Sequence, residues 1–114
     1  FYWLNSEDQI DAVTAVSGSG PAYVFLLAEC LAAAARDQGL PDELADRLAR
    51  VTVAGSGELL HQSAKDAATL RQNVTSPGGT TEAALNVLMA VDGMAPLVKK
   101  AVQAAFQKSK ELAG

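Results

Sequence analysis

Hydroxyl and glycine residues gather in one short run, residues 75–81, which reads TSPGGTT. Its proline stiffens the chain, and its two glycines permit unusual backbone angles and leave N–H groups accessible. Ser76, Thr80 and Thr81 bring three hydroxyls to the expected start of a helix, where unpaired N–H groups and the helix dipole favour an anion. The run predicts a small carboxylate site without a cationic side chain. An ordinary turn with a helix N-cap needs only one of these hydroxyls, and that alternative stays open.

Other familiar catalytic sets are missing from the sequence. His61 is the only histidine, so a Ser-His-Asp triad or a cluster of histidine metal ligands cannot form within one chain, and no metal is expected. Residues 18–20 and 55–57 each read GSG and begin a dinucleotide-like pattern. Tyr23 and Leu60 occupy the place of the third glycine, and neither run follows a convincing strand. We interpret both runs as close contacts between helices.

Helix signals mark the elements that must position the loop. Ser6 and Gln9 have the spacing of a capping box, which predicts a helix starting near Glu7, although residues 13–16 would also suit a strand. Glycines 18 and 20 with Pro21 are expected to interrupt or kink the path. A second helix is predicted from Pro21 to about residue 38, stopped by Gly39.

The second half of the chain predicts more helices. Pro41 suits the first turn of a third helix, which carries leucines on helical spacing up to residue 60. Asp66 opens a short helix to residue 72. Thr80 or Thr81 is expected to cap the next helix, which we expect to end at Gly93. The last helix has one apolar face, formed by Leu97, Val98, Ala101, Val102, Ala105 and Phe106. The fold class predicted is all-α.

Composition narrows the range of functions. The 114 residues carry a net charge of −4, and no basic stripe for nucleic acid is visible. The longest apolar run, residues 22–35, is too short to span a membrane and contains Glu29, so no membrane role is expected. No signal peptide is seen, and one cysteine, Cys30, fits a reducing cytoplasm. Charged residues make up only 19%, which hints at a buried interface.

Two stretches resemble a known family. Residues 11–25, DAVTAVSGSGPAYVF, and 70–85, LRQNVTSPGGTTEAAL, are similar to the C-terminal helical domain of pyrroline-5-carboxylate reductases. The resemblance implies an all-α bundle that interlocks with a second copy, like the C-terminal domain of 6-phosphogluconate dehydrogenase. It implies one domain over residues 1–114, with residues 1–5 as the end of a linker from a Rossmann domain that this chain lacks.

The resemblance also implies an activity. The family reduces 1-pyrroline-5-carboxylate to L-proline, the last step of proline biosynthesis. By similarity, the substrate carboxylate sits on the Ser76 hydroxyl and on the N–H groups of Gly79, Thr80 and Thr81, and the catalytic Thr81 hydroxyl bonds the ring nitrogen. The cofactor, NADPH or NADH, is held mainly by the missing N-terminal domain. This piece alone is therefore expected to be inactive.

Family members assemble as homodimers and in some cases as rings of dimers, and the same is implied for this chain. The chain is expected to be cytoplasmic. Two alternatives remain beside the reductase. One is the helical domain of a related dehydrogenase, against which the loop 75–81 argues. The other is a non-catalytic helical association module, in which that loop is only a turn.

Overall fold

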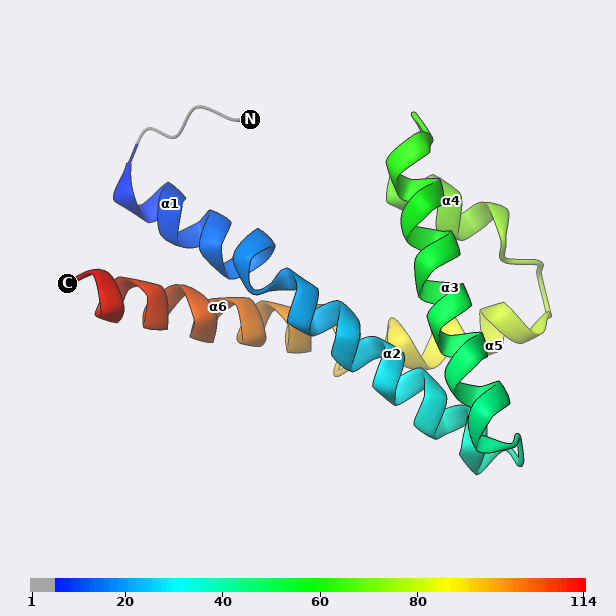
Figure 1. The fold of residues 1–114 in the computed structure, drawn as a ribbon. Coiled ribbons are helices and arrows are strands. Elements are labelled where there is room, and N and C mark those ends of the chain that lie inside the picture. The colour runs from blue at the N-terminus through cyan, green and yellow to red at the C-terminus, as the bar shows by residue number, and fades with distance from the viewer. Residues whose placement is uncertain (1–5) are drawn as a thin grey trace. The chain divides into compact units, whose positions relative to one another are not determined.

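The computed structural model describes residues 6–114, and within them the chain is helical, with no strand (Figure 1). The elements in chain order are α1 (Glu7–Val13), the π-helical segment η1 (Thr14–Gly18), α2 (Gly20–Asp37), α3 (Asp42–Gln62), α4 (Ala67–Asn73), α5 (Thr80–Leu88) and α6 (Met94–Ala113). The predicted all-α class is confirmed. The linker expected at residues 1–5 lies outside the described residues.

The chain divides into two compact units, which we describe separately. The first holds the residues up to Pro21 together with Ala83–Gly114, and the second is Ala22–Glu82. The single domain expected over residues 1–114 stays a prediction.

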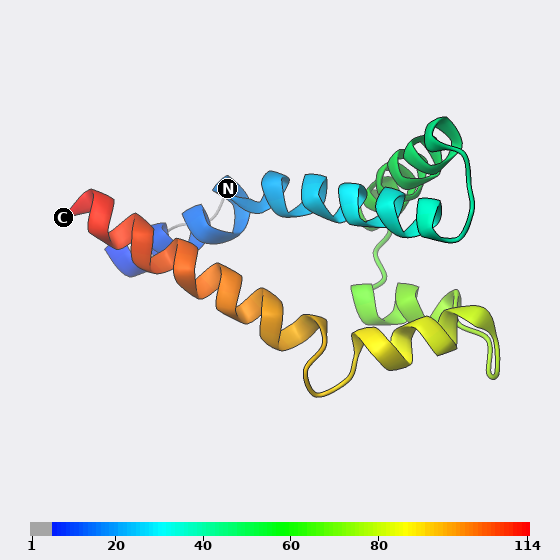
Figure 2. The same ribbon diagram turned by 90° about the horizontal axis from the view of Figure 1, so that it is seen from below.

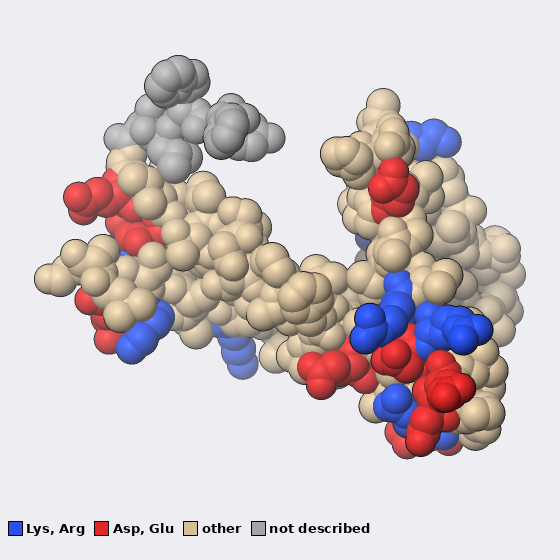
Figure 3. Space-filling view, viewed as in Figure 1, with Lys and Arg blue, Asp and Glu red and all other residues tan. Residues whose placement is uncertain are grey.

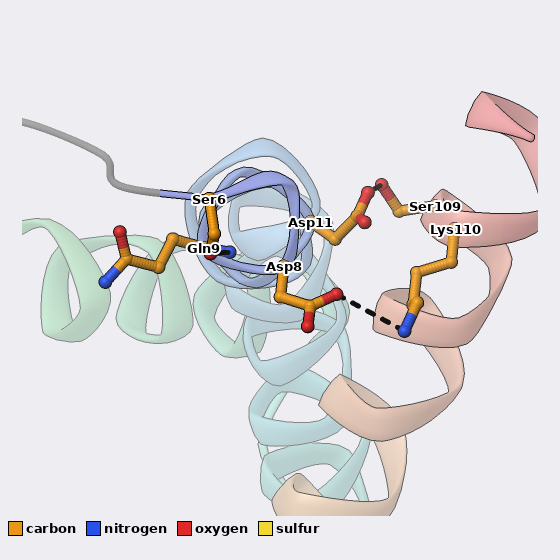
Figure 4. Close-up of polar contacts among 6 residues, drawn as sticks. All are labelled: Ser6, Asp8, Gln9, Asp11, Ser109 and Lys110. Carbon is orange, nitrogen blue, oxygen red and sulfur yellow. Dashed lines mark hydrogen bonds and ion pairs between the residues drawn. The ribbon is translucent and has the colours of Figure 1, made fainter.

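In the first unit, α6 runs beside α1 and η1, as the views in Figures 1 and 2 agree. The predicted cap at Ser6 is confirmed, because its Oγ accepts the Gln9 N–H at 3.3 Å. Two polar contacts join α6 to α1 (Figure 4): Ser109 Oγ donates to Asp11 Oδ1 at 2.6 Å, and Lys110 Nζ lies 3.3 Å from Asp8 Oδ1. Between the helices, a groove is lined by the apolar side chains of Ala12, Val16, Val98, Val102 and Phe106.

The predicted interruption near Gly18 takes the form of a π turn. Ser19 N–H donates to Thr14 O, five residues back, at 2.9 Å, and a Cβ on Gly18 would make only ordinary contact with the Thr14 side chain. Two hydroxyls, Thr14 Oγ1 and Ser17 Oγ, donate to carbonyls four residues earlier at 3.0 and 2.9 Å. Such bonds compete with the backbone ladder and loosen a helix locally. The strand alternative for residues 13–16 is wrong, since the path stays helical.

In the second unit, α2 and α3 form a helical hairpin. Gly39 ends the turn after α2 with φ +97°, a backbone conformation that favours glycine. Arg36 Nε meets Asp42 Oδ1 at 3.1 Å across this turn, and Arg50 pairs with Asp46 one turn apart on α3. Charged side chains gather around the turn, at the lower right of Figure 3.

The buried core of the described chain is small and consists of alanines. The buried apolar residues among those described are Ala15, Ala32, Ala45 and Ala49, and no large side chain is fully buried. Large apolar side chains instead face outward: Phe25 and Leu97 are each 67% exposed, and Val51 is 62% exposed. The predicted apolar face of α6 is therefore only partly covered within one chain, at Val102, Ala105 and Phe106. Such surface is typical of a chain that packs against something else.

Prediction and structure differ at the end of α5. The helix was expected to continue to Gly93, but it ends at Leu88, and Gly93 instead directly precedes α6. A tight turn follows α5, with Met89 N–H bonded to Leu85 O and Gly93 N–H bonded to Ala90 O. A Cβ on Gly93 would lie 2.2 Å from the Leu88 carbonyl oxygen. The glycine is thus required by the close return of the chain.

One helical run, Glu7–Asp37, is long and apolar enough by length and composition to cross a membrane. It exceeds the run 22–35 considered from sequence because the π turn joins α1 to α2. A core helix of a soluble protein and a signal sequence pass the same test, and this run carries Glu29 in its second half.

Candidate functional site

The loop between α4 and α5 is fastened to α4 at its first residue. Asp66 caps α4, with its Oδ1 accepting the Thr69 N–H at 2.8 Å. At the other end of the helix, Thr75 Oγ1 donates to Arg71 O at 2.6 Å, and its N–H donates to Gln72 O at 3.1 Å. The loop therefore leaves α4 in a defined direction.

The two glycines make the corner of the loop. Gly78 has φ +74°, where a side chain would be strained. Gly79 N–H donates to Ser76 O at 3.0 Å, and a Cβ on Gly79 would lie 3.2 Å from that same oxygen. Both glycines thus serve a tight turn immediately before α5, as the sequence indicated.

The structure brings the predicted site residues into this one turn and the first turn of α5. Ser76 and Thr80 are exposed, while Gly79 and Thr81 are half-buried. Because α5 begins at Thr80, the N–H groups of Thr80 and Thr81 belong to the first turn, which lacks partners within a helix. A cap at Thr80 or Thr81 was wrong, since both residues are already helical. Within residues 6–114, no hydrogen bond engages the hydroxyls of Ser76, Thr80 or Thr81.

One predicted donor is already engaged. The Gly79 N–H bonds the Ser76 carbonyl at 3.0 Å, so a bound carboxylate would have to share it. Among the three N–H groups that the sequence predicted as donors, Gly79 N–H is thus the one already bonded within the loop.

Sequence reasoning missed Glu82. Its Oε1 accepts the Gly78 N–H at 3.1 Å, so the side chain reaches back over the glycine corner from the third residue of α5. A signal was present, because an acidic residue at the third helical position commonly returns to backbone N–H groups before the helix.

The remaining candidates lie elsewhere. His61 sits in the last turn of α3, and Gly55 and Gly57 lie inside α3 with nothing within 4 Å of an added Cβ. Close helix contacts at these two glycines are thus not made by the described part of the chain. No group of three or more metal-binding side chains occurs among the residues the structure describes.

The fold and the loop define a class of protein: a helical domain with exposed apolar faces and a hydrogen-bonded polar turn directly before a helix. A sequence model described as "Pyrroline-5-carboxylate reductase dimerisation" matches residues 7–112. The chain belongs to the pyrroline-5-carboxylate reductase dimerisation family.

Relatives agree with this assignment. The chain is 50% identical to a pyrroline-5-carboxylate reductase of Pseudomonas aeruginosa over 97% of its own length and 40% of the relative's. It is 46% identical to the reductase of Arabidopsis thaliana, over 93% of this chain and 38% of that one. The chain therefore spans about two fifths of the length of these relatives.

Solved structures share the fold. A pyrroline-5-carboxylate reductase from Coxiella burnetii matches with a TM-score of 0.90 and 46% identity, over 96% of this chain and 40% of that chain. The Plasmodium falciparum pyrroline carboxylate reductase, solved with NADP bound, matches with a TM-score of 0.87 and 38% identity, over 96% of this chain and 42% of that chain.

Proposed function

We propose that this chain is the dimerisation and substrate-binding domain of a cytoplasmic reductase that converts 1-pyrroline-5-carboxylate to L-proline. The observation that carries the proposal is the turn of residues 76–79, directly before α5, in a chain that matches the family from residue 7 to residue 112. Family membership argues against a related dehydrogenase, and the built turn argues against a purely structural module.

The substrate carboxylate binds at the start of α5. The Ser76 hydroxyl and the N–H groups of Thr80 and Thr81 donate to it, and Gly79 N–H shares its bond with the Ser76 carbonyl. The positive end of the α5 dipole favours the anion there. No lysine or arginine lies within residues 72–98, so backbone donors and hydroxyls must carry this recognition.

Thr81 acts on the reacting bond. Hydride adds to the C=N carbon more readily when the nitrogen carries positive charge, and the Thr81 hydroxyl bonds that nitrogen and orients the ring. A hydroxyl is a poor general acid near neutral pH, so the proton comes from water or is already on the imine.

A nicotinamide cofactor, NADPH or NADH, supplies the hydride. We propose that residues outside this helical chain hold most of that cofactor, since the chain carries no dinucleotide fingerprint of its own.

The helices bind a second copy of the chain. Within one chain the buried apolar residues described are alanines, while Phe25, Val51 and Leu97 face outward. Interlocking two copies would cover these side chains, and some assemblies would build further into rings of dimers. A stable homodimer of this kind should bury well over the roughly 1,600 Å² of a standard interface.

The proposal is tested by co-crystallising the full-length protein with L-proline. We expect the product carboxylate against Ser76, Thr80 and Thr81, and the ring nitrogen at the Thr81 hydroxyl. Proline found elsewhere, or no binding at concentrations that saturate the reverse reaction, would reject this site.

A further inference from the structure

We propose that Glu82 is a positioning residue for the substrate loop, which it holds by accepting the Gly78 N–H. The inference rests on the proposed function, because it matters to catalysis only if the loop 75–81 binds the substrate carboxylate.

The contact spans the glycine corner. Glu82 Oε1 accepts the Gly78 N–H at 3.1 Å, and the Glu82 residue is half-buried. The second bond of the corner runs from Gly79 N–H to Ser76 O at 3.0 Å. These two bonds tie both sides of Gly78, whose positive φ of +74° is open mainly to glycine. Without the Glu82 bond, the most freely rotating residue of the loop would be held from one side only.

The reach of the side chain separates this contact from an ordinary helix cap. A capping-box glutamate returns to the residue directly before the helix, here Gly79. Glu82 passes that residue and takes the N–H of Gly78, which is not among the donors assigned to the substrate. Of the two bonds at the corner, only the one from Gly79 N–H to Ser76 O uses a donor that is assigned to the substrate.

A second role for Glu82 would predict the opposite behaviour. Its carboxylate could act through charge alone, by interacting with the α5 dipole or the substrate, whatever its exact reach. Two substitutions separate the roles. Glu82→Gln keeps the length and an acceptor oxygen but removes the charge, whereas Glu82→Asp keeps the charge and shortens the reach by one methylene.

The experiment is steady-state kinetics with 1-pyrroline-5-carboxylate on the full-length protein. We expect Glu82→Gln to keep its KM within about twofold of the wild type, and Glu82→Asp to raise KM about three- to tenfold, the effect of one lost hydrogen bond. Turnover should change less than KM in both. Glu58→Asp is the matched control, because Glu58 also accepts a side-chain hydrogen bond, from Gln62, but on α3. It should leave KM unchanged.

Amide exchange gives a readout independent of activity. The Gly78 amide proton should exchange faster in Glu82→Asp than in the wild type or Glu82→Gln. An impaired Glu82→Gln, or a Glu82→Asp with unchanged KM and Gly78 exchange, would overturn the positioning role.

The inference and the proposed function fail separately. If Ser76→Ala raises KM while Glu82→Asp does not, only the role of Glu82 is wrong. If Ser76→Ala leaves KM unchanged, the carboxylate does not bind this loop, and the proposed site itself is wrong.

Discussion

Ser109 and Asp11, 98 positions apart in sequence, are joined by a hydrogen bond of 2.6 Å from Ser109 Oγ to Asp11 Oδ1 (Figure 4). Asp11 is only 7% exposed, so a carboxylate at the α1–α6 contact depends on this donor. Bonds to charged groups are stronger than neutral ones, and an unsatisfied buried acceptor is costly.

Ser109→Ala should therefore lower the free energy of unfolding by about 1–3 kcal/mol. Asp8→Asn is the control, because Asp8 makes an exposed ion pair with Lys110 that is worth about 0–1 kcal/mol. Chemical denaturation of both variants at equal protein concentration measures the difference. Equal losses in the two variants would show that the buried bond has no special weight.

Thr81→Ala should separate catalysis from stability. In the full-length protein, loss of the hydrogen-bond partner of the ring nitrogen should lower turnover about 10²–10³-fold. The melting temperature should change little, because no hydrogen bond engages the Thr81 hydroxyl within the described residues. Ser76→Ala should instead raise KM, since its carboxylate contact is similar in ground and transition states. A Thr81→Ala enzyme with normal turnover would remove Thr81 from the mechanism.

Gly55→Ala is informative because it would either stabilise or destabilise the protein, depending on whether a second copy packs against this glycine. An added methyl meets nothing within 4 Å in the described chain, and alanine favours a helix interior by about 1 kcal/mol over glycine. If the chain acted alone, the substitution would stabilise it. We expect the reverse, with weakened dimerisation in analytical ultracentrifugation, because the glycine permits close approach of a helix of the second copy.

Gly93→Ala should be among the most damaging substitutions outside the loop. The new Cβ would lie 2.2 Å from the Leu88 carbonyl oxygen, so the turn between α5 and α6 must open. We expect a loss of at least about 2 kcal/mol, visible as a lower melting temperature. Asp92→Ala, at an exposed neighbour in the same turn, should stay close to the wild type.

Asp66 makes stability depend on acid pH. Hydrogen bonds from the Thr69 side chain, and then from its backbone N–H, hold the pKa of Asp66 below its ordinary value of 3.8. A lowered pKa in the folded state contributes stability above the unfolded pKa, and this contribution is lost as pH falls through the folded pKa. Asp66→Asn keeps an acceptor but does not titrate. Chemical denaturation should therefore give the wild type a higher free energy of unfolding than this variant at pH 7, and the difference should shrink as the pH falls below 3.8.

Much of the local structure could be predicted because it depends on neighbours in sequence. The helix caps at Ser6 and Asp66 follow from side chains that accept a backbone N–H three residues later. The helix stop at Gly39 follows from the positive φ that glycine adopts without strain. The loop 75–81 was predicted as a polar turn before a helix for the same reason.

The errors have a different origin. The end of α5 was misplaced because Gly93 is required by a carbonyl five residues back, a contact that composition does not reveal. Glu82 was overlooked because an acidic residue in a first helical turn is ordinary, and its reach to Gly78 depends on the shape of the corner. The apolar face of α6 could be read from its period, but helical periodicity does not say whether the surface that covers it comes from the same chain.

The alanine-lined interior of this chain has a consequence for cells that carry two versions of the gene. If each subunit completes its fold only by interlocking with another, a version with a damaged loop and intact helices would still find partners among normal subunits. Mixed pairs would then outnumber normal pairs at equal expression, and each would carry one damaged loop beside one intact loop. Changes on the exposed apolar face would behave recessively, because such subunits never enter an assembly.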